Sequence, residues 1–433
     1  MLYEFRFGNY RSFRDQAVLS MEANGLKMCK ERLIWGSSKK YLPAAAIYGK
    51  NGGGKSNIIR AFWLTVRFIN HAQMTQHENA EVPVQPFALN NYSSQEPTTF
   101  DFVYSYNNVK YWYGFAATKD HIESEYLYHA PNSKKALVFS RTLQNFAFTK
   151  DKATRKLISK VVAPNQLFIA AACTMNDLDC VTAMKWFRTC VFFFRDYTDL
   201  SPRLLENFEN NKILNAITNY AKAADVGIDS MRFEFNQNEI TDDVISPKGM
   251  PDNLKKALSS FIHTLSETSN NSEVKLQIGS VKATTVHKGK NKDNSVTSYE
   301  MPLDTESDGT RKLMSLAPAI EYALNIGVVL FVDDLERGLH PALVNYIVAK
   351  FQNKQSNPKG AQLIFTTHNT ELLNIEILRK DQLYFVDKQP DGASELYSIS
   401  DFGTRTTENV RKGYLLGKYG AVPDVEIAEI NGG

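Results

Sequence analysis

The sequence predicts an α/β fold with an antiparallel β subdomain and an inserted, mainly helical segment. Two short apolar runs, Pro43–Tyr48 and Gly327–Val332, have the length and composition of buried strands in a parallel sheet. Alternating aromatic residues after position 100 indicate antiparallel strands, and residues 151–275 contain amphipathic helical patterns. Because the two buried strands lie far apart in the sequence, we expect a large middle section to interrupt one α/β core.

The N-terminal part is expected to be rich in strands. Residues 2–22 contain two apolar stretches around a polar turn and predict a strand pair. Aromatic residues alternate over 100–104, Asn107-Asn108 suits a tight turn, and residues 109–115 and 122–128 supply two more strands. This order predicts an antiparallel meander against the α/β core.

The middle of the chain is expected to be mainly helical. Residues 178–193 are apolar with few helix breakers, and Ser201-Pro202 suits a helix start because serine caps and proline fits the first turn. Leu254–Leu265 carry a second amphipathic face. Residues 274–303 are predicted to form a hairpin that returns to the core.

Composition limits the class of protein. A chain of 433 residues should form two or three structural units, and its net charge of +3 leaves nucleic-acid contact to local patches such as Lys288–Lys292, a run that is also typical of a solvated loop. The four cysteines lack the spacing of a zinc site, which fits a reducing compartment. With no signal peptide and no apolar stretch near the roughly twenty residues of a membrane span, we expect a cytoplasmic protein without membrane contact.

A glycine-rich loop follows the first buried strand. The run Gly49 to Ser56 fits the phosphate-loop pattern G-x-x-x-x-G-K-[ST] at every fixed position. Residues 58–69 then repeat apolar side chains at helical spacing, so strand, loop and helix stand in the order that the motif needs. The lysine places a charge between β- and γ-phosphates, and the serine hydroxyl can ligate Mg²⁺. The residues expected to bind the nucleotide here are Gly49, Asn51, Gly52, Gly53, Gly54, Lys55, Ser56 and Asn57.

Two carboxylates follow the second buried strand. Asp333 and Asp334 stand where an α/β sheet presents ligands, at the carboxyl end of a strand. We expect Asp333 to hold Mg²⁺ through water, opposite Ser56, and Asp334 to orient or deprotonate the attacking water. Together the two motifs predict an ATP and Mg²⁺ site.

The wide separation of the motifs resembles the ABC-type ATPase heads of SMC, RecF and related DNA-repair proteins. Ser307-Asp308-Gly309 is similar to the ABC signature, whose serine and glycine reach the γ-phosphate held by the opposite subunit, although it also suits an ordinary serine-capped helix. Leu335–Pro341 resemble a run found in OLD-type and abortive-infection (AbiLi-like) ATPases of bacteria. His368 matches the switch histidine that contacts the γ-phosphate.

Further residues resemble the same group. Arg11, within Asn9–Phe13, is similar to an arginine that approaches the phosphates, and Gln85 is a candidate Q-loop ligand of the metal. Residues 414–423 look like the tail of the abortive-infection ATPases. The resemblance therefore touches nearly the whole chain, specifically in the nucleotide motifs and only vaguely in the middle.

The chain also departs from that group. Asp334 occupies the position of the usual catalytic glutamate, one methylene shorter, which predicts slow hydrolysis; Glu336 is a possible substitute. Pro318 should kink the helix after the signature or delay its start.

The resemblance implies an ABC-type head in which residues 1–150 and 301–433 form the two halves and 151–300 are inserted. It implies ATP-dependent homodimers or multiples of them, serving as the ATPase subunit of an anti-phage defence complex. A separate nuclease or toxin, as in Septu-like and PARIS-like pairs, would then be the effector. The alternatives are a RecF- or SMC-like DNA-repair ATPase without a toxic partner and, less favoured because of the insertion, a transporter ATPase.

Overall fold

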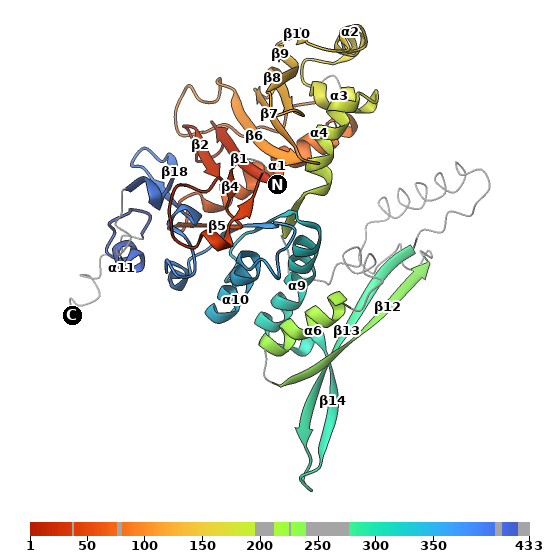
Figure 1. Cartoon of the computed structure of the whole chain (residues 1–433), viewed down its shortest axis with the longest axis vertical. Helices are drawn as coiled ribbons and strands as arrows, with labels where there is room; N and C mark the ends of the chain where they lie inside the picture. The colour runs from red at the N-terminus through yellow and green to blue at the C-terminus, as the bar shows by residue number, and fades with distance from the viewer. Residues whose placement is uncertain are drawn as a thin grey trace. The chain divides into compact units, whose positions relative to one another are not determined.

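The computed structural model describes residues 1–36, 39–75, 80–194, 212–224, 227–239, 277–402 and 409–422. The chain divides into two compact units (Figure 1). The first consists of Met1–Arg195 with Ala319–Gly433, and the second of Asp196–Pro318.

A mostly parallel sheet of six strands forms the base of the first unit, in the order β11-β15-β16-β5-β17-β18. Neighbouring strands run parallel except β17 and β18. The strands are β5 (Ala44–Gly49), β11 (Val191–Phe194), β15 (Val329–Val332), β16 (Gln362–Thr366), β17 (Leu383–Lys388) and β18 (Ser394–Ser398). Every residue of β5, β15 and β16 is buried, as expected for central strands of a covered sheet. Both predicted apolar strands are confirmed.

An antiparallel sheet of seven strands completes the first unit, in the order β10-β9-β8-β7-β6-β1-β2. Its strands are β1 (Leu2–Gly8), β2 (Ala17–Ser20), β6 (Thr98–Tyr106), β7 (Val109–Ala117), β8 (Ile122–Ala130), β9 (Ala136–Thr142) and β10 (Asn145–Phe148). Asn107 and Asn108 adopt φ of 49° and 62° in the β6–β7 turn. The predicted N-terminal pair and meander are confirmed.

Helix α1 (Lys55–Thr75) joins the two sheets through its apolar side. The Phe62 ring lies 4.7 Å from that of Phe5 in the antiparallel sheet and 4.4 Å from that of Phe331 in the parallel sheet, so one core serves both. The remaining elements of the unit are α2 (Lys152–Val161), α3 (Phe168–Thr174), α4 (Leu178–Thr189), α10 (Pro341–Gln352), α11 (Val410–Leu415), the pair β3 (Ile34–Trp35) and β4 (Lys40–Tyr41), and the 3₁₀ turns η1 (Lys30–Arg32), η3 (Thr370–Leu372), η4 (Lys380–Gln382) and η5 (Ile399–Phe402).

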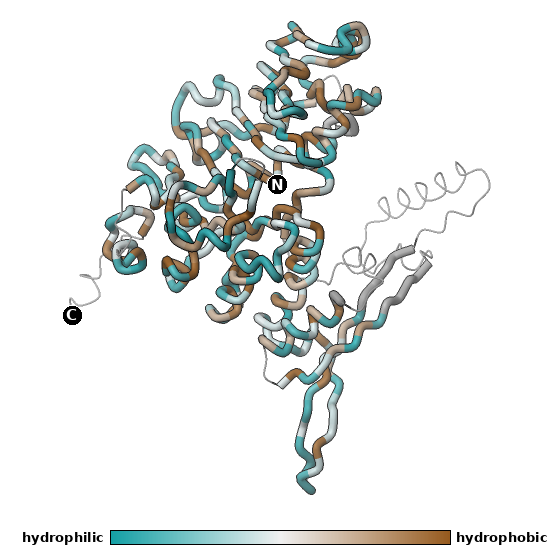
Figure 2. The backbone as a smooth tube through the Cα atoms, viewed as in Figure 1, coloured by the Kyte–Doolittle hydropathy of each residue, from teal (hydrophilic) through white to brown (hydrophobic). Residues whose placement is uncertain are grey.

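The second unit contains a three-stranded antiparallel sheet in the order β12-β13-β14. Its described elements are α6 (Lys212–Ala224), β12 (Ile228–Glu239), β13 (Gln277–Lys290), β14 (Val296–Pro302) and the 3₁₀ turn η2 (Leu303–Thr305). Every residue of β14 is exposed, and the tip of the β13–β14 hairpin is hydrophilic (Figure 2). A hairpin is confirmed over Gln277–Pro302, and it belongs to the second unit rather than to the α/β core of the first.

The middle of the chain differs from the sequence prediction of a helical insertion over 151–300. Residues 151–195 belong to the first unit, because α4 packs on the antiparallel sheet through Tyr104 and Trp186 and β11 pairs with β15. The apolar stretch 178–193 is thus a helix followed by a strand. The helices predicted from Ser201-Pro202 and over Leu254–Leu265 lie outside the described residues.

Helix α9 (Asp308–Ile326) runs through Pro318, where the division between the two units falls. A helix start after the proline is therefore wrong. No helix of the described ranges is long and apolar enough to cross a membrane.

Candidate nucleotide site

The glycine loop connects β5 to α1 and requires glycine for steric reasons. Gly54 has φ of +114°, and a Cβ there would lie 2.6 Å from Ser394 Oγ and 2.8 Å from Ser12 Oγ. A Cβ on Gly49 would lie 2.4 Å from the Val386 carbonyl oxygen. Segments far apart in the sequence therefore close around this loop, and a side chain fits at neither of these two positions.

Lys55 is buried inside the loop that precedes it. Its Nζ donates to the carbonyl oxygens of Gly49 and Lys50 at 2.8 and 3.3 Å. Burial lowers the pKa of Lys55, while the carboxylates of Asp334, Glu336 and Asp333 oppose that change. The ammonium group is thus held at the centre of the loop and faced by the acidic segment.

The acidic segment Asp333–Glu336 contacts the serine of the loop. Ser56 Oγ donates to Asp333 Oδ1 at 3.0 Å. Thr366, at the end of β16, donates to the same oxygen at 2.6 Å and accepts a hydrogen bond from the backbone N–H of Asp334 at 2.7 Å. Sequence reasoning missed Thr366, although its place at the carboxyl end of a parallel strand was an available signal.

Asp334 and Glu336 lie on the turn after β15 in different settings. Asp334 adopts φ of 49°, a left-handed conformation that aspartate tolerates better than glutamate. Glu336 Oε1 accepts the backbone N–H of His368 at 2.5 Å, whereas its buried Oε2 has no hydrogen-bond partner among the described residues. The His368 side chain itself is exposed. Glu336 therefore turns toward the segment that follows β16, at His368 and Asn369, rather than away from it.

Tyr48 lies at the end of β5 beneath this segment and donates from its hydroxyl to the Asn369 carbonyl at 3.0 Å. Burial raises the pKa of Tyr48 well above its usual range, and the nearby Glu336 carboxylate adds to that rise. The tyrosine is therefore a neutral hydrogen-bond donor that ties the segment after β16 to strand β5.

A second layer of polar contacts holds the outside of the loop. Arg11 Nε donates to Gln85 Oε1 at 2.6 Å, and Arg11 Nη1 lies 3.5 Å from Asn57 Oδ1. Asn57 Nδ2 donates to Ser12 Oγ at 2.8 Å, and Ser394 Oγ donates to the Gly53 carbonyl at 2.6 Å. The structure thus gathers Arg11, Gln85 and Asn57 at one place, with the oxygen of Gln85 occupied by arginine. Ser12 and Ser394 carried no sequence signal, because their role depends on segments brought together only by folding.

The signature residues belong to the second unit and are described apart from the loop. Ser307 is exposed, and its Oγ accepts the backbone N–H of Thr310 at 3.2 Å, which caps α9. Gly309 lies in the first turn of the same helix. This geometry is compatible with both interpretations of the motif, as a helix cap and as a phosphate contact.

The donor set fits a magnesium ion that depends on nucleotide. Within the described residues no group of three His, Cys, Asp or Glu side chains could hold a metal unaided. Mg²⁺ commonly uses one or two protein oxygens and completes its shell with water and phosphate. Ser56 and Asp333 supply such oxygens, so these two residues suit a Mg²⁺ ion.

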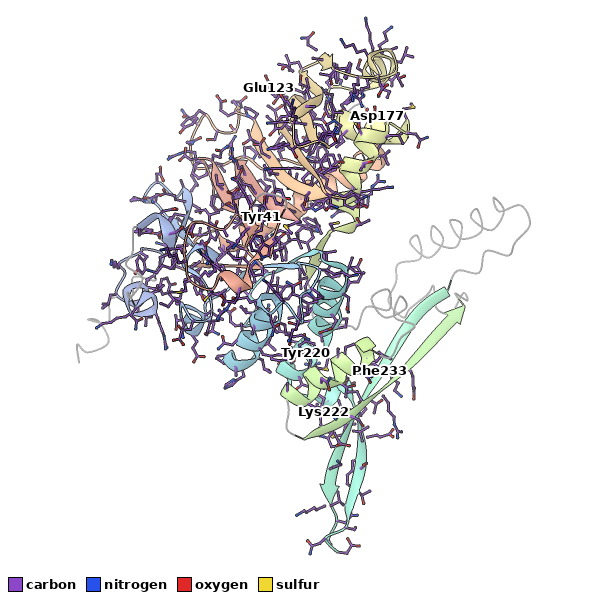
Figure 3. The ribbon with its side chains drawn as sticks, viewed as in Figure 1. Tyr41, Glu123, Asp177, Tyr220, Lys222 and Phe233 are labelled. Carbon is purple, nitrogen blue, oxygen red and sulfur yellow. The ribbon has the colours of Figure 1, made fainter. Side chains whose placement is uncertain are left out.

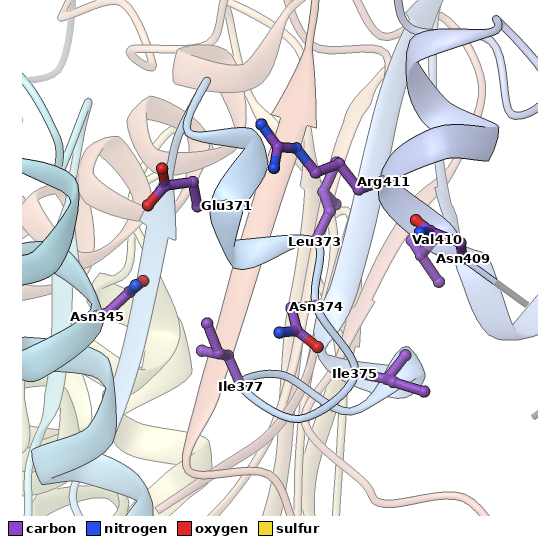
Figure 4. Close-up of a pocket in the computed structure, with 9 residues that line it drawn as sticks. All are labelled: Asn345, Glu371, Leu373, Asn374, Ile375, Ile377, Asn409, Val410 and Arg411. Atoms are coloured by element: carbon purple, nitrogen blue, oxygen red, sulfur yellow. The ribbon is translucent and has the colours of Figure 1, made fainter. Parts of the chain in front are cut away.

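A pocket of about 560 Å³ lies next to the segment that follows His368 (Figure 4). Asn345 of α10, Glu371, Asn374 and Arg411 of α11 line it with several aliphatic residues. Sequence reasoning did not predict this pocket, because its walls come from three separate stretches of chain.

Strand, glycine loop, helix and acidic strand end define a P-loop nucleotide-binding protein. Residues 44–374, more than half of the chain, match the family model described as "AAA domain, putative AbiEii toxin, Type IV TA system". The chain belongs to this family of P-loop ATPases.

Two solved structures are similar to the chain over most of its length. One is the Smc head bound to the C-winged helix domain of ScpA, at 13% identity and a TM-score of 0.39, covering 92% of this chain and 97% of that one. The other is cbiO1 from Clostridium perfringens, part of the ABC transporter complex cbiONQ, at 11% identity and a TM-score of 0.29, with 96% of each chain covered. At these scores they support no conclusion about function. No curated protein matches the chain.

Proposed function

We propose that this protein binds ATP with Mg²⁺ and hydrolyses it, and that the bound nucleotide joins two copies of the chain. The observation that carries the proposal is the hydrogen-bonded group of Ser56, Asp333 and Thr366 beside the glycine loop. Its hydroxyl and carboxylate oxygens are of the kind that a phosphate-bound Mg²⁺ prefers, which supports the proposal. When bound, Mg²⁺ would neutralise charge on the phosphates.

The other residues receive roles that suit their settings. The backbone N–H groups of the loop bind the phosphates, Lys55 neutralises them, and Arg11 with Gln85 and Asn57 supports the loop from outside. We assign proton acceptance from the attacking water to Glu336 Oε2, because that atom is buried and unpartnered. Asp334 orients the water, and His368 contacts the γ-phosphate. Ser307 and Gly309 of the partner subunit would close the site.

At the cellular level we propose a bacterial anti-phage ATPase of the abortive-infection type, acting in the cytoplasm on a separate nuclease or toxin effector. The family description, which names an AbiEii toxin and a Type IV TA system, supports a place in defence. The second candidate is a DNA-repair ATPase, favoured by the lysines of the exposed β13–β14 hairpin. Lys288, however, pairs with Asp229 at 2.6 Å, which reduces the free positive charge of that patch.

The first test is ATP turnover by the Lys55→Ala variant, with the exposed Lys388→Ala in β17 as a matched control. We expect turnover to fall to background in the first and to be unchanged in the second. Retained turnover in Lys55→Ala would refute the site.

The second test separates the two cellular roles. We would purify the tagged protein, expressed from its own operon, with ATP present and measure the native mass. Mass beyond two copies, contributed by a neighbouring gene product, supports the defence role. A mass of two copies alone favours the repair role.

A further inference from the structure

The residue before the signature serine is anchored in a way that the residues around it are not. Thr305, Ser307 and Asp308 are exposed, whereas the Glu306 side chain is only 6% exposed. An acidic side chain buried in an otherwise exposed turn needs polar partners to offset its desolvation. Those partners come from a strand of the same unit rather than from α9.

Strand β13 supplies the two partners that the Glu306 side chain has among the described residues. His287 Nε2 lies 2.7 Å from Glu306 Oε1, and the Thr285 hydroxyl is within hydrogen-bond distance of the same oxygen. Thr285 is fully buried and also lies 3.1 Å from the Met301 carbonyl of β14. One carboxylate oxygen is thus held by two side chains two positions apart, which share a face of the strand.

Strand β13 is the central strand of its sheet, so these partners are themselves well fixed. Thr285 pairs with Met231 of β12 on one side and with Met301 of β14 on the other. Glu306 therefore connects the start of α9 to the middle of a sheet. The covalent path between them, through η2, is exposed at Asp304 and Thr305.

We propose that Glu306 is a positioning residue for the signature turn, through which the β12–β14 sheet determines where Ser307 and Gly309 lie. Ser307 bonds only within its own turn in the contacts described, to Thr310. Glu306 adds a contact from the turn to a different element, β13. Any displacement of the β13–β14 hairpin is then transmitted to the serine that closes the nucleotide site of the partner subunit. This last step rests on the function proposed above.

Hydrogen exchange on the full chain without nucleotide tests the anchoring directly. The variants are Glu306→Ala, the conservative Glu306→Gln, and Ser298→Ala on the exposed β14 strand as control. We expect amides of residues 306–312 to exchange at least about tenfold faster in Glu306→Ala, with partial recovery in Glu306→Gln, because hydrogen bonds to a charged group are lost. Unchanged exchange in Glu306→Ala overturns the proposal, whether or not the protein hydrolyses ATP.

Nucleotide assays then test whether Glu306 affects ATP-dependent association and hydrolysis. With a fluorescent ATP analogue, Glu306→Ala should bind within about twofold of the unchanged protein, since its phosphate loop is intact. ATP-dependent association, measured by sedimentation, and kcat should fall about tenfold or more with little change in KM. Equal loss of binding and association would make Glu306 only a folding residue. If the unchanged protein does not associate with ATP, the proposed function fails, while the exchange result still decides the anchoring.

Discussion

The glycine loop and the signature turn would contact the same phosphates, yet the protein supports them very differently. The loop is enclosed by Ser12 from the N-terminal segment and by Val386 and Ser394 from β17 and β18. In the signature turn, Ser307 and Asp308 are exposed, and the contacts described tie the turn to β13 through Glu306. The loop is therefore enclosed by several segments, whereas the signature serine lies on the surface of its unit.

This difference indicates which half can move. A loop that several segments surround cannot shift without disturbing the core, because packed interiors resist small displacements. An exposed turn that is tied to a strand can shift with that strand. We infer that the glycine loop is preformed for nucleotide, whereas the signature turn can respond to whatever displaces the β12–β14 sheet. The following predictions test residues of the first unit. They run from the largest expected effect on ATP binding or turnover to the smallest.

Gly54→Ala should strongly impair nucleotide binding by the loop. The added Cβ would meet Ser394 Oγ at 2.6 Å and Ser12 Oγ at 2.8 Å in a backbone conformation at φ +114° that alanine rarely adopts. We expect ATP affinity to fall about a hundredfold, from strain and lost contacts of about 3 kcal/mol. Titration with a fluorescent ATP analogue measures it.

The matched control is Gly417→Ala, also at positive φ (+74°) but with no atom within 4 Å of the added Cβ. It should cost about 1 kcal/mol of unfolding free energy and leave ATP affinity unchanged. If the two variants bind ATP equally well, close packing around the loop is not what shapes the site.

Glu336→Gln should lower kcat about tenfold to a hundredfold with ATP affinity unchanged, because it removes the proposed proton acceptor and keeps the side-chain shape. Single-turnover hydrolysis measures the step. Glu371→Gln is the control, because Glu371 is an exposed glutamate in the segment that follows His368. Equal rates in Glu336→Gln and the unchanged protein would reject the assignment.

Asp334→Glu tests the other carboxylate after β15. Glutamate fits the left-handed φ of 49° less well than aspartate, so we expect about 1 kcal/mol lower stability and no gain in rate. A clear gain would show that side-chain length at position 334 limits hydrolysis.

The nucleotide half of the fold was predictable because its signals are local. The run from Gly49 to Ser56, the apolar strands and the Asn107-Asn108 turn each follow from neighbouring residues alone. The unit boundaries and the strand at Val191–Phe194 were not predicted, because apolar residues 178–193 fit either helix or strand until β15 is available to pair.

Within the candidate site, the sequence predicted residues that belong to a motif and gave no sign of contacting residues without one. Thr366, Ser12 and Ser394 bond to the loop or to Asp333, but they act only once β16, β18 and the N-terminal segment are adjacent. Likewise, the left-handed conformation of Asp334 explains aspartate at this position in physical terms that the sequence alone did not provide.

The smallest expected effect on ATP binding and turnover lies away from the nucleotide, at an ion pair that stabilises the first unit. Asp177, labelled in Figure 3, caps α4 by accepting the Cys180 N–H at 3.1 Å and binds Arg155 through both oxygens at 2.7 and 3.1 Å. Burial raises the pKa of Asp177, but hydrogen bonds from Arg155 and Cys180 outweigh it, and the pKa lies below its usual value. A lowered pKa in the folded state means that the charged form adds stability.

Asp177→Asn should therefore lower the free energy of unfolding by about 1–2 kcal/mol at neutral pH, since one bond to a charged partner is weakened. The difference in unfolding free energy between Asp177→Asn and the unchanged protein should be constant above about pH 5. It should shrink as the pH falls through the usual aspartate pKa of about 4 toward the lower folded value. Urea unfolding at several pH values measures it, and kcat should not change. A pH-independent difference would show that the ionised carboxylate contributes nothing, and a loss of kcat would show that this support reaches the nucleotide site.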